Sequence, residues 1–106
     1  MATLPVGFDD QLSAAVTRRL GVEGVLVREV YDGSPADVAG LHGTSVDRRG
    51  RVIPGDVVQE IDGKPVRSVS DLLGRLGGYK PGDSVTLTVW RDGAAKKLAV
   101  KLRAPE

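Results

Sequence analysis

The run of residues 25–66 constrains the fold of this chain more than any other part, because capping and turn residues divide it into short elements. Ser34 places a capping hydroxyl before Pro35, and proline is favoured at the first position of a helix. Gly40 follows soon afterwards and ends that helix. The run as a whole therefore reads as a strand (24–30), a short helix, a polar surface loop (42–54), a strand (57–61) and a tight turn at Asp62-Gly63.

Two longer helices are predicted on either side of this run. The first covers residues 10–20, where Asp10 can cap the start and Gly21 follows the last turn. The second begins after Ser68 and ends at a pair of glycines, Gly77-Gly78. In both helices the apolar residues recur on one face, so each helix is expected to pack that face against the rest of the domain.

The C-terminal part of the chain predicts a hairpin. Residues 84–90 alternate between polar and apolar side chains, Asp92-Gly93 turns the chain, and residues 97–102 return. Together with the short elements before it, this hairpin predicts a mainly β domain with helices. We expect a partly open barrel or sandwich of about five or six strands, capped by two helices, with an added short helix near the N-terminus.

Length and composition bound the domain and its partners. The chain has 106 residues and no cysteine, which fits one domain and leaves no disulfide framework or thiolate metal site. We predict a single domain over residues 4–103, with residues 1–3 resembling an expression start and residues 104–106 forming a disordered tail. The net charge of +1 provides no field that would attract nucleic acid or an anionic membrane. No membrane-spanning run or secretory signal is present, so if the parent protein is secreted or tethered to a membrane, its targeting segment is expected outside this sequence.

Catalytic and cofactor chemistry finds no support in the residue pattern. His42 is the only histidine; a nucleophilic triad would have to use it, and it lies in a polar loop without a patterned partner. Asp9 and Asp10 are adjacent, so their side chains would point apart, and no loop supplies the alternating oxygen ligands that calcium prefers. We therefore expect no catalytic residue, no metal and no cofactor, which leaves a binding surface as the functional feature.

Several short motifs occur together in one order along the chain. They are Gly-Ser-Pro-Ala, Ala-Gly-Leu, Gly-Asp, Ile-Asp-Gly-Lys-Pro-Val and Lys-Pro-Gly-Asp-Ser-Val-Thr-Leu-Thr-Val-Trp-Arg-Asp-Gly. Each motif alone is weak, but over residues 4–102 the combination resembles the PDZ domain of HtrA/Deg-type, trypsin-like serine proteases. The resemblance implies a domain that holds peptide ends and does not cut them.

PDZ domains of this family bind a peptide C-terminus by strand addition, between an exposed strand edge and the second long helix. The resemblance implies that Val6, Gly7 and Phe8 form the loop whose backbone N–H groups receive the terminal carboxylate. Gly7 would allow the close, left-handed backbone of such a nest, whereas Pro5 has no N–H to donate. The alternative is that these apolar residues are only core at one end of the domain.

The resemblance also implies that the second long helix forms the other wall of the groove, with Val69, Leu73 and Leu76 facing the peptide and Leu72 facing the core. Without it, the same apolar stripe would be assigned to the core. Val69 stands where many eukaryotic PDZ domains have a histidine that selects Ser or Thr. We therefore expect an apolar ligand residue two before the end and a small or medium apolar last residue. Asp9 would lie beside the groove and disfavour acidic peptides.

The polar loop carries three arginines, Arg48, Arg49 and Arg51, which are either a solvated surface or a docking loop for a protease body or a neighbouring subunit. The leading hypothesis is a peptide-binding module that recruits substrate to, or regulates, an HtrA/Deg-like serine endopeptidase in the cell envelope. Its expected partners are C-terminal peptides of unfolded or regulatory proteins and the protease domain of the same polypeptide, with no nucleic acid and no membrane insertion. The isolated domain is expected to be a monomer.

Three alternatives to this hypothesis stay open. The chain could be a structural or docking domain with a closed groove that sets the geometry of a protease oligomer. It could be a PDZ domain of another membrane-associated protease or of a secretion component. An enzyme with unrecognised chemistry is the third, and cleavage of casein that a serine-directed inhibitor abolishes would reveal it.

Overall fold

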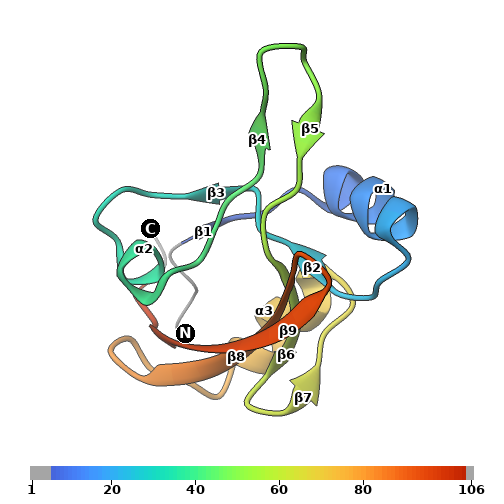
Figure 1. The fold of residues 1–106 in the computed structure, drawn as a ribbon. Helices are drawn as coiled ribbons and strands as arrows, with labels where there is room; N and C mark the ends of the chain where they lie inside the picture. The colour runs from blue at the N-terminus through green and yellow to red at the C-terminus, as the bar shows by residue number, and fades with distance from the viewer. Residues whose placement is uncertain (1–5, 105–106) are drawn as a thin grey trace.

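A computed structural model describes residues 6–104 of the chain (Figure 1). Three helices occur in this stretch: α1 (Asp10–Leu20), α2 (Pro35–Ala39) and α3 (Val69–Leu76). The strands are short except for the last two. They are β1 (Val6–Gly7), β2 (Val25–Leu26), β3 (Glu29–Val30), β4 (Ser45–Val46), β5 (Val52–Ile53), β6 (Val57–Ile61), β7 (Lys64–Pro65), β8 (Ser84–Arg91) and β9 (Ala94–Lys101).

The strands form one larger sheet and two small ones, all antiparallel. The larger sheet has the order β2-β6-β8-β9, with β7 paired to β6, while β1 pairs with β3 and β4 pairs with β5. Within residues 6–104 the path from β2 to β9 does not close on itself. The predicted fold class, a mainly β domain with helices and no closed barrel, is therefore confirmed, and the β4–β5 hairpin stands away from its body (Figure 1).

Helices α1 and α3 pack on opposite sides of β2, and the alternation of a strand explains how. Val25 and Val27 belong to the main buried cluster, which also contains Leu72 of α3, whereas Leu26 belongs to a smaller cluster with Val16 of α1. Successive side chains of a strand point to opposite faces. Leu26 therefore lies on the side of α1, and Val25 and Val27 lie on the side of the cluster that includes α3. All five of these side chains are at most 7% exposed, and burial of each stabilises the fold by roughly 1.5–3 kcal/mol.

The sheet supplies the rest of the core through the alternation that the sequence predicted. Val85, Leu87 and Val89 of β8 are at most 2% exposed, while the residues between them face outward or are half-buried. The turn Asp92-Gly93 joins β8 to β9, and β9 begins earlier than predicted, at Ala94. One face of this hairpin is therefore buried, as the sequence indicated.

Two predicted segments differ from the structure, and the first difference has a long-range cause. The predicted strand over 24–30 is divided into β2 and β3, which belong to different sheets, because the chain between them bonds to segments distant in sequence. There the N–H of Val27 donates to the carbonyl of Asp56, and the N–H of Thr44 donates to the carbonyls of Val27 and Arg28. The predicted surface loop 42–54 contains the β4–β5 hairpin.

The helix ends are set mostly by the caps that the sequence indicated. Ser34 and Ser68 accept backbone N–H donors at the starts of α2 and α3, and Gly21 ends α1 in the left-handed conformation. At the start of α1 the cap is Asp9 and not Asp10, because Asp9 Oδ1 accepts from the N–H of Leu12 at 3.0 Å. Asp10 is thereby left with a different role, described below.

Candidate functional site

Strand β1 is a short edge strand. It pairs with β3 in the register Val6↔Val30 and Gly7↔Glu29, and no strand within residues 6–104 pairs with its other edge. An unpaired strand edge presents backbone N–H and C=O groups to whatever lies beside it. This edge is the feature of the N-terminal region that can accept another extended chain.

The three residues predicted to form a carboxylate-binding loop lie at this strand. Val6 and Gly7 are strand residues, and Phe8 directly follows them. Gly7 is absent from the residues with left-handed backbone, so its backbone is that of a strand, and its part in binding a carboxylate stays a prediction. The side chain of Val6 is 8% exposed within the main buried cluster, and the half-buried Phe8 packs against that cluster. The backbone of these residues therefore forms an edge strand, while the side chains of Val6 and Phe8 pack in or against the core.

Helix α3 presents the residues that were predicted to form the opposite wall. Val69 is half-buried against the main cluster, and the side chain of Leu73 is 37% exposed. Leu72 and Leu76 are both fully buried, so the inclusion of Leu76 in an exposed wall was wrong. The spacing of the apolar residues explains why Leu76 is buried. Val69, Leu72 and Leu76 follow one another at intervals of three and four residues and form the stripe that faces the core, so Leu73 lies at the margin of this stripe.

The start of α1 connects these two elements. Asp10 Oδ1 accepts a hydrogen bond from the backbone N–H of Val69 at 3.3 Å, so it caps one of the donors that the first turn of α3 leaves open. Asp9, which the sequence placed beside the groove, uses Oδ1 to cap α1. The two adjacent carboxylates thus fix the starts of two different helices, α1 and α3, and hold these helices together.

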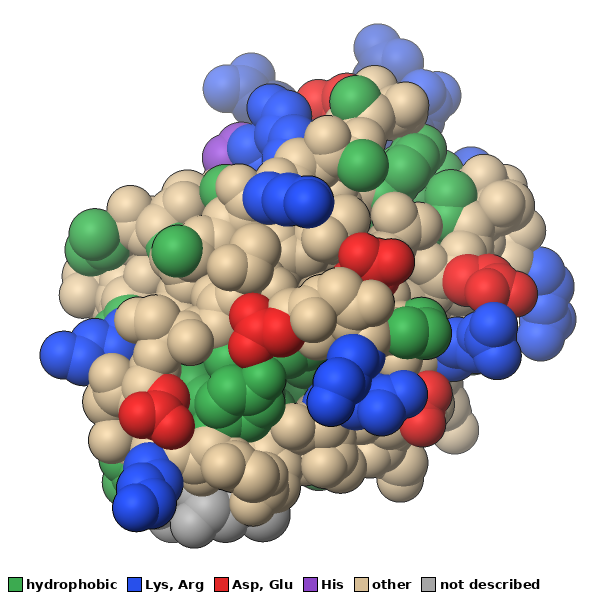
Figure 2. All heavy atoms as spheres, turned by 90° about the horizontal axis from the view of Figure 1, so that it is seen from below, with side chains coloured by type: hydrophobic (Ala, Val, Ile, Leu, Met, Phe, Trp, Pro, Cys, Tyr) green, Lys and Arg blue, Asp and Glu red, His purple; other side chains and the backbone are tan. Residues whose placement is uncertain are grey.

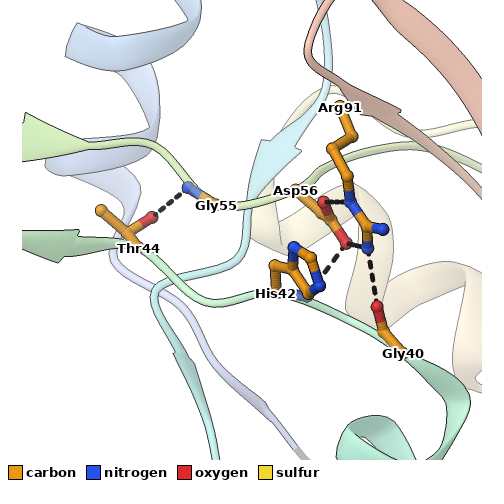
Figure 3. A network of polar contacts seen from close by, with 6 residues as sticks. All are labelled: Gly40, His42, Thr44, Gly55, Asp56 and Arg91. Carbon is orange, nitrogen blue, oxygen red and sulfur yellow. Dashed lines mark hydrogen bonds and ion pairs between the residues drawn. The ribbon is translucent and has the colours of Figure 1, made fainter.

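A buried ion pair holds the loops around the centre of the domain (Figure 3). Both carboxylate oxygens of Asp56, which is fully buried, accept from the guanidinium of Arg91, and Asp56 also accepts from the N–H of His42 at 3.0 Å. Arg91 donates in addition to the carbonyl of Gly40 at 2.6 Å. The neighbouring carboxylate raises the pKa of Arg91 further above its ordinary value. We interpret this cluster as structural, because both carboxylate oxygens of Asp56 and both Nε and Nη2 of Arg91 already have partners within the domain.

The cluster requires close backbone contact at one glycine. A Cβ on Gly55 would lie 2.4 Å from the carbonyl carbon of Gly43 and 2.5 Å from the carbonyl oxygen of His42. The Thr44 hydroxyl accepts from the N–H of Gly55 at 3.0 Å and donates to the carbonyl of Val27 at 2.8 Å. The base of the β4–β5 hairpin is therefore fixed, although its tip stands in solvent.

The tip of this hairpin carries the three arginines of the predicted docking loop. Arg48, Arg49 and Arg51 are all exposed. The carboxylate of Asp47 organises the turn by accepting from the N–H groups of Arg49 and Arg51 at 2.8 and 3.0 Å. The arginine side chains are thus presented on an ordered turn.

On the face seen in Figure 2, basic and acidic side chains are interspersed around a central hydrophobic patch.

Near the tight turn at Asp62, the carboxylate accepts from the hydroxyl of Tyr79 and from the N–H of Thr86 at 2.7 Å. The hydrogen bond from Tyr79, and then that from Thr86, lowers the pKa of Asp62 below its ordinary value of 3.8. Hydrogen bonding to the charged form of a carboxyl explains this direction.

Within residues 6–104, no three His, Asp or Glu side chains converge into a set that could hold a metal ion. None of the helices in that stretch is long and apolar enough to span a bilayer.

Comparison with known proteins places these features in a family. A model of the PDZ domain family matches residues 5–102. Among curated proteins, Protease Do-like 1, chloroplastic, of Arabidopsis thaliana is 40% identical over 84 residues, which is 79% of this chain and 19% of that protein. A probable periplasmic serine endoprotease, DegP-like, of Ectopseudomonas mendocina is 38% identical over 79 residues, or 74% of this chain and 14% of that protein. The chain thus spans a fifth or less of the length of these relatives.

Solved structures show the same fold. The HtrA-type protease AlgW with decapeptide superposes with a TM-score of 0.70 at 23% identity, covering 99% of this chain and 30% of that one. The HtrA3 PDZ domain bound to a phage-derived ligand (FGRWV) superposes with a TM-score of 0.68 at 16% identity, covering 97% of this chain and 86% of that one.

Proposed function

Because this chain belongs to the PDZ domain family and its relatives are HtrA/Deg-type serine proteases, we propose that it binds peptide C-termini by strand addition. In this role it recruits substrate to, or regulates, a serine endopeptidase of the HtrA/Deg type. Its ligands are the C-terminal ends of unfolded or regulatory proteins, and its partner is the protease domain of the same polypeptide. In this proposal the chain itself is a binding module, which the PDZ domain match over residues 5–102 supports.

The observation that carries the proposal is the open edge of β1 beside α3. The carbonyl of Gly7 faces the chain that leads into β3, where it accepts from the N–H of Arg28, the residue before that strand, at 3.0 Å. Backbone groups alternate along a strand, so the N–H groups of Val6 and Phe8 face the opposite edge. The backbone carbonyls of an extended peptide that adds at this edge would accept hydrogen bonds from those N–H groups. Its terminal carboxylate would accept from N–H groups at the same edge.

Helix α3 supplies the side-chain selectivity in this proposal. Val69 and Leu73 are the two apolar residues of the helix that are not fully buried. Val69 has no hydrogen-bonding group on its side chain, so it favours an apolar ligand residue two positions before the end. The last ligand residue is a small or medium apolar side chain that packs beside Leu73 and Phe8.

The proposed affinity is modest. β1 has only two residues, so strand addition extends over few backbone hydrogen bonds, and Asp9 and Asp10 repel acidic ligands. We expect a dissociation constant in the micromolar range or weaker, which corresponds to a binding free energy of about 8 kcal/mol or less in magnitude.

The names of the similar proteins support both the ligand class and the location. Two of the similar structures are described as HtrA-type proteins with a decapeptide and with a phage-derived peptide ligand. The curated relatives are described as chloroplastic or periplasmic proteases. This likeness supports the proposal that the present protein acts in the cell envelope, in the periplasm or on the outer side of a membrane.

Selection from a library of peptides with free, randomised C-termini tests the proposal. We expect enrichment of apolar residues at the last position and at the position two before it, and loss of binding when a selected peptide is amidated. The variant Leu73→Lys should lose binding, whereas Val38→Lys, which changes a side chain 82% exposed on α2, should not. Enrichment of Ser or Thr at the upstream position, or equal binding of amidated peptides, would contradict the proposed groove.

One observation favours a second candidate function. The contact of Asp10 with Val69 and the full burial of Leu76 mean that part of the predicted helical wall is already covered by this chain's own residues. A domain with a groove closed in this way would serve as a docking element that sets the geometry of a protease oligomer. The same selection separates the two functions, because a closed groove enriches no C-terminal sequence while the domain stays folded.

A further inference from the structure

An apolar hollow lies between α1 and the β4–β5 hairpin, away from β1 and α3. The first part of it has a volume of about 210 Å³ and is lined by Val16, Arg19, Leu20, Val52 and Pro54. A second part of about 170 Å³ shares Leu20 and Pro54 with the first. It continues along Ile53, Gly55, Trp90, Arg91 and Asp92.

The hairpin leaves apolar side chains in solvent beside this hollow. Val52 and Ile53 of β5 are 40% and 49% exposed, and Val46 of β4 is 64% exposed. The hairpin projects from the body of the domain (Figure 1), so its own fold cannot cover them. Contiguous exposed apolar groups rimmed by polar residues are typical of interaction sites. We call the two hollows together with Val46 the α1–hairpin surface.

The two elements that flank this surface carry five arginines, of which Arg19 lines the first hollow. Arg18 and Arg19 lie in the last turn of α1, and Arg48, Arg49 and Arg51 lie at the hairpin tip. All five are exposed, and no carboxylate within residues 6–104 forms an ion pair with any of them.

Two carboxylates, Asp47 and Asp92, offset part of this charge, so that five arginines stand against two carboxylates. The carboxylate of Asp47 already accepts two backbone N–H groups of its own turn. Asp92 lines the far end of the second hollow, next to Arg91. The surface therefore carries a net positive charge around an apolar floor, although the chain as a whole has a net charge of only +1.

We propose that the α1–hairpin surface docks an acidic protein segment that carries apolar side chains. Charge complementarity selects the acidic partner, because the flanking arginines lack ion-pair partners within the described part of the chain. The floor selects the apolar side chains, which would fill the two hollows while the acidic groups meet the arginines. Arginine suits this role because its planar guanidinium binds carboxylates at two points.

The proposed docking is independent of C-terminal recognition. It uses side chains of α1, the hairpin and Trp90, and none of Val6, Phe8, Val69 or Leu73. A segment in the middle of a partner protein could therefore bind here while the groove at β1 is empty or filled. Failure of one site would leave the other unaffected, so the two proposals are tested separately.

Selection from a phage library of randomised dodecapeptides, displayed as N-terminal fusions without a free C-terminus, tests this inference. We expect enriched peptides to combine acidic residues with at least two apolar ones. A selected peptide, synthesised with an amidated end, should change the fluorescence of Trp90, the only tryptophan of the chain. It should also shift the backbone amide resonances of residues 16–20 and 45–55.

Matched variants then assign the binding to this surface. Ile53→Asp and, separately, Arg19→Glu should each weaken the selected peptide by about tenfold or more. The controls Val38→Asp on α2 and Arg75→Glu on α3 change exposed side chains of the same two kinds elsewhere and should leave the affinity within about twofold. Having both an apolar and a charge variant keeps the test valid if one of them fails to fold.

Three results would overturn the inference: no enrichment above an unselected library, enrichment of basic sequences, or resonance shifts confined to β1 and α3. Binding of a single-stranded oligonucleotide with equal affinity would also overturn it, because the arginines would then recognise phosphate and not an acidic protein segment.

Discussion

The guanidinium of Arg91 binds the carboxylate of Asp56 at two points, with Nε 2.6 Å from Oδ1 and Nη2 2.6 Å from Oδ2. The carboxylate is fully buried, and the side chain of Arg91 is 16% exposed. The pair joins the start of β6 to the end of β8, and its further hydrogen bonds to Gly40 and His42 hold the chain between α2 and the hairpin.

Removing one partner of this pair should destabilise the domain strongly. Arg91→Met leaves the carboxylate of Asp56 buried without a counter-ion, which is expected to lower the free energy of unfolding by about 3–5 kcal/mol. Urea denaturation followed by circular dichroism measures this loss. The matched control is Arg67→Met, since Arg67 pairs with Glu23 at the surface, where both side chains are more than two-thirds exposed. That control should cost less than about 1 kcal/mol, and equal losses in the two variants would contradict this account of the pair.

A glycine contact gives a second stability prediction. Gly55→Ala would place a methyl group 2.4 Å from the backbone of Gly43, so the hairpin base must move and the free energy of unfolding should fall by more than about 2 kcal/mol. Gly74→Ala is the control, because Gly74 lies inside α3 with open space around its Cα. It should stabilise the domain by about 0.5–1 kcal/mol. Thermal unfolding distinguishes the two directions.

Elements fixed by local chemistry could be predicted from the sequence, and elements fixed by distant contacts could not. The caps at Ser34 and Ser68 act within three residues, and the alternation of β8 is visible in its own run of residues. The division between β2 and β3 depends on bonds to Thr44 and Asp56, which no local pattern indicates. The wrong cap at Asp10 shows the same limit, since two adjacent aspartates are equivalent until the helix geometry is known.

The candidate site was predicted in part for a similar reason. The apolar stripe of α3 could be predicted from the sequence. Which residues of that stripe are buried depends on the elements that pack against the helix, and Leu76 proved to be part of the core. The ion pair of Asp56 and Arg91 spans 35 residues. Both residues occur within quoted motifs, Gly-Asp and Trp-Arg-Asp-Gly, yet nothing in the sequence joins them. The apolar surface at the hairpin was missed because residues 42–54 were interpreted as a polar loop.

The contact of Asp10 with Val69 predicts how long a bound peptide can be. Asp10→Ala removes the acceptor that holds the start of α1 against α3, which should allow a longer peptide to lie along α3. The ratio of the affinity of six-residue peptides to that of three-residue peptides should therefore rise severalfold. Fluorescence anisotropy with labelled peptides of both lengths measures this ratio. Asp9→Ala is the control: it removes the cap of α1 and costs about 1 kcal/mol of stability, but it should leave the length ratio unchanged. An unchanged ratio in Asp10→Ala would mean that this contact does not limit the groove.

The lowered pKa of Asp62 predicts a dependence of stability on pH. Because the folded state depresses this pKa below 3.8, the stabilisation is fully present above the unfolded value and is lost as the pH falls through the folded value. The difference in unfolding free energy between the wild type and Asp62→Asn should therefore be constant at neutral pH and shrink below about pH 4. The exposed position keeps the whole effect below about 1 kcal/mol.

Two further variants test the cause of this pH dependence. Tyr79→Phe removes the hydrogen bond that contributes most to the lowered pKa, so it should remove much of the effect. Asp92→Asn makes the same change at the other tight turn, where φ is 50° compared with 49° at Asp62, and controls for the effect of asparagine on the turn itself. A difference for Asp62→Asn that grows as the pH falls would have the wrong sign for this account.

The central claim is that the open edge of β1 and the exposed part of α3 hold a peptide C-terminus. The most direct measurement is a titration of the isotope-labelled domain with peptides that end in apolar residues, followed by backbone amide resonances. The account predicts shifts concentrated at residues 6–10 and 69–76, and their loss when the peptide end is amidated. Shifts elsewhere, or no shifts in a folded domain, would contradict it and would favour a closed domain that serves in docking.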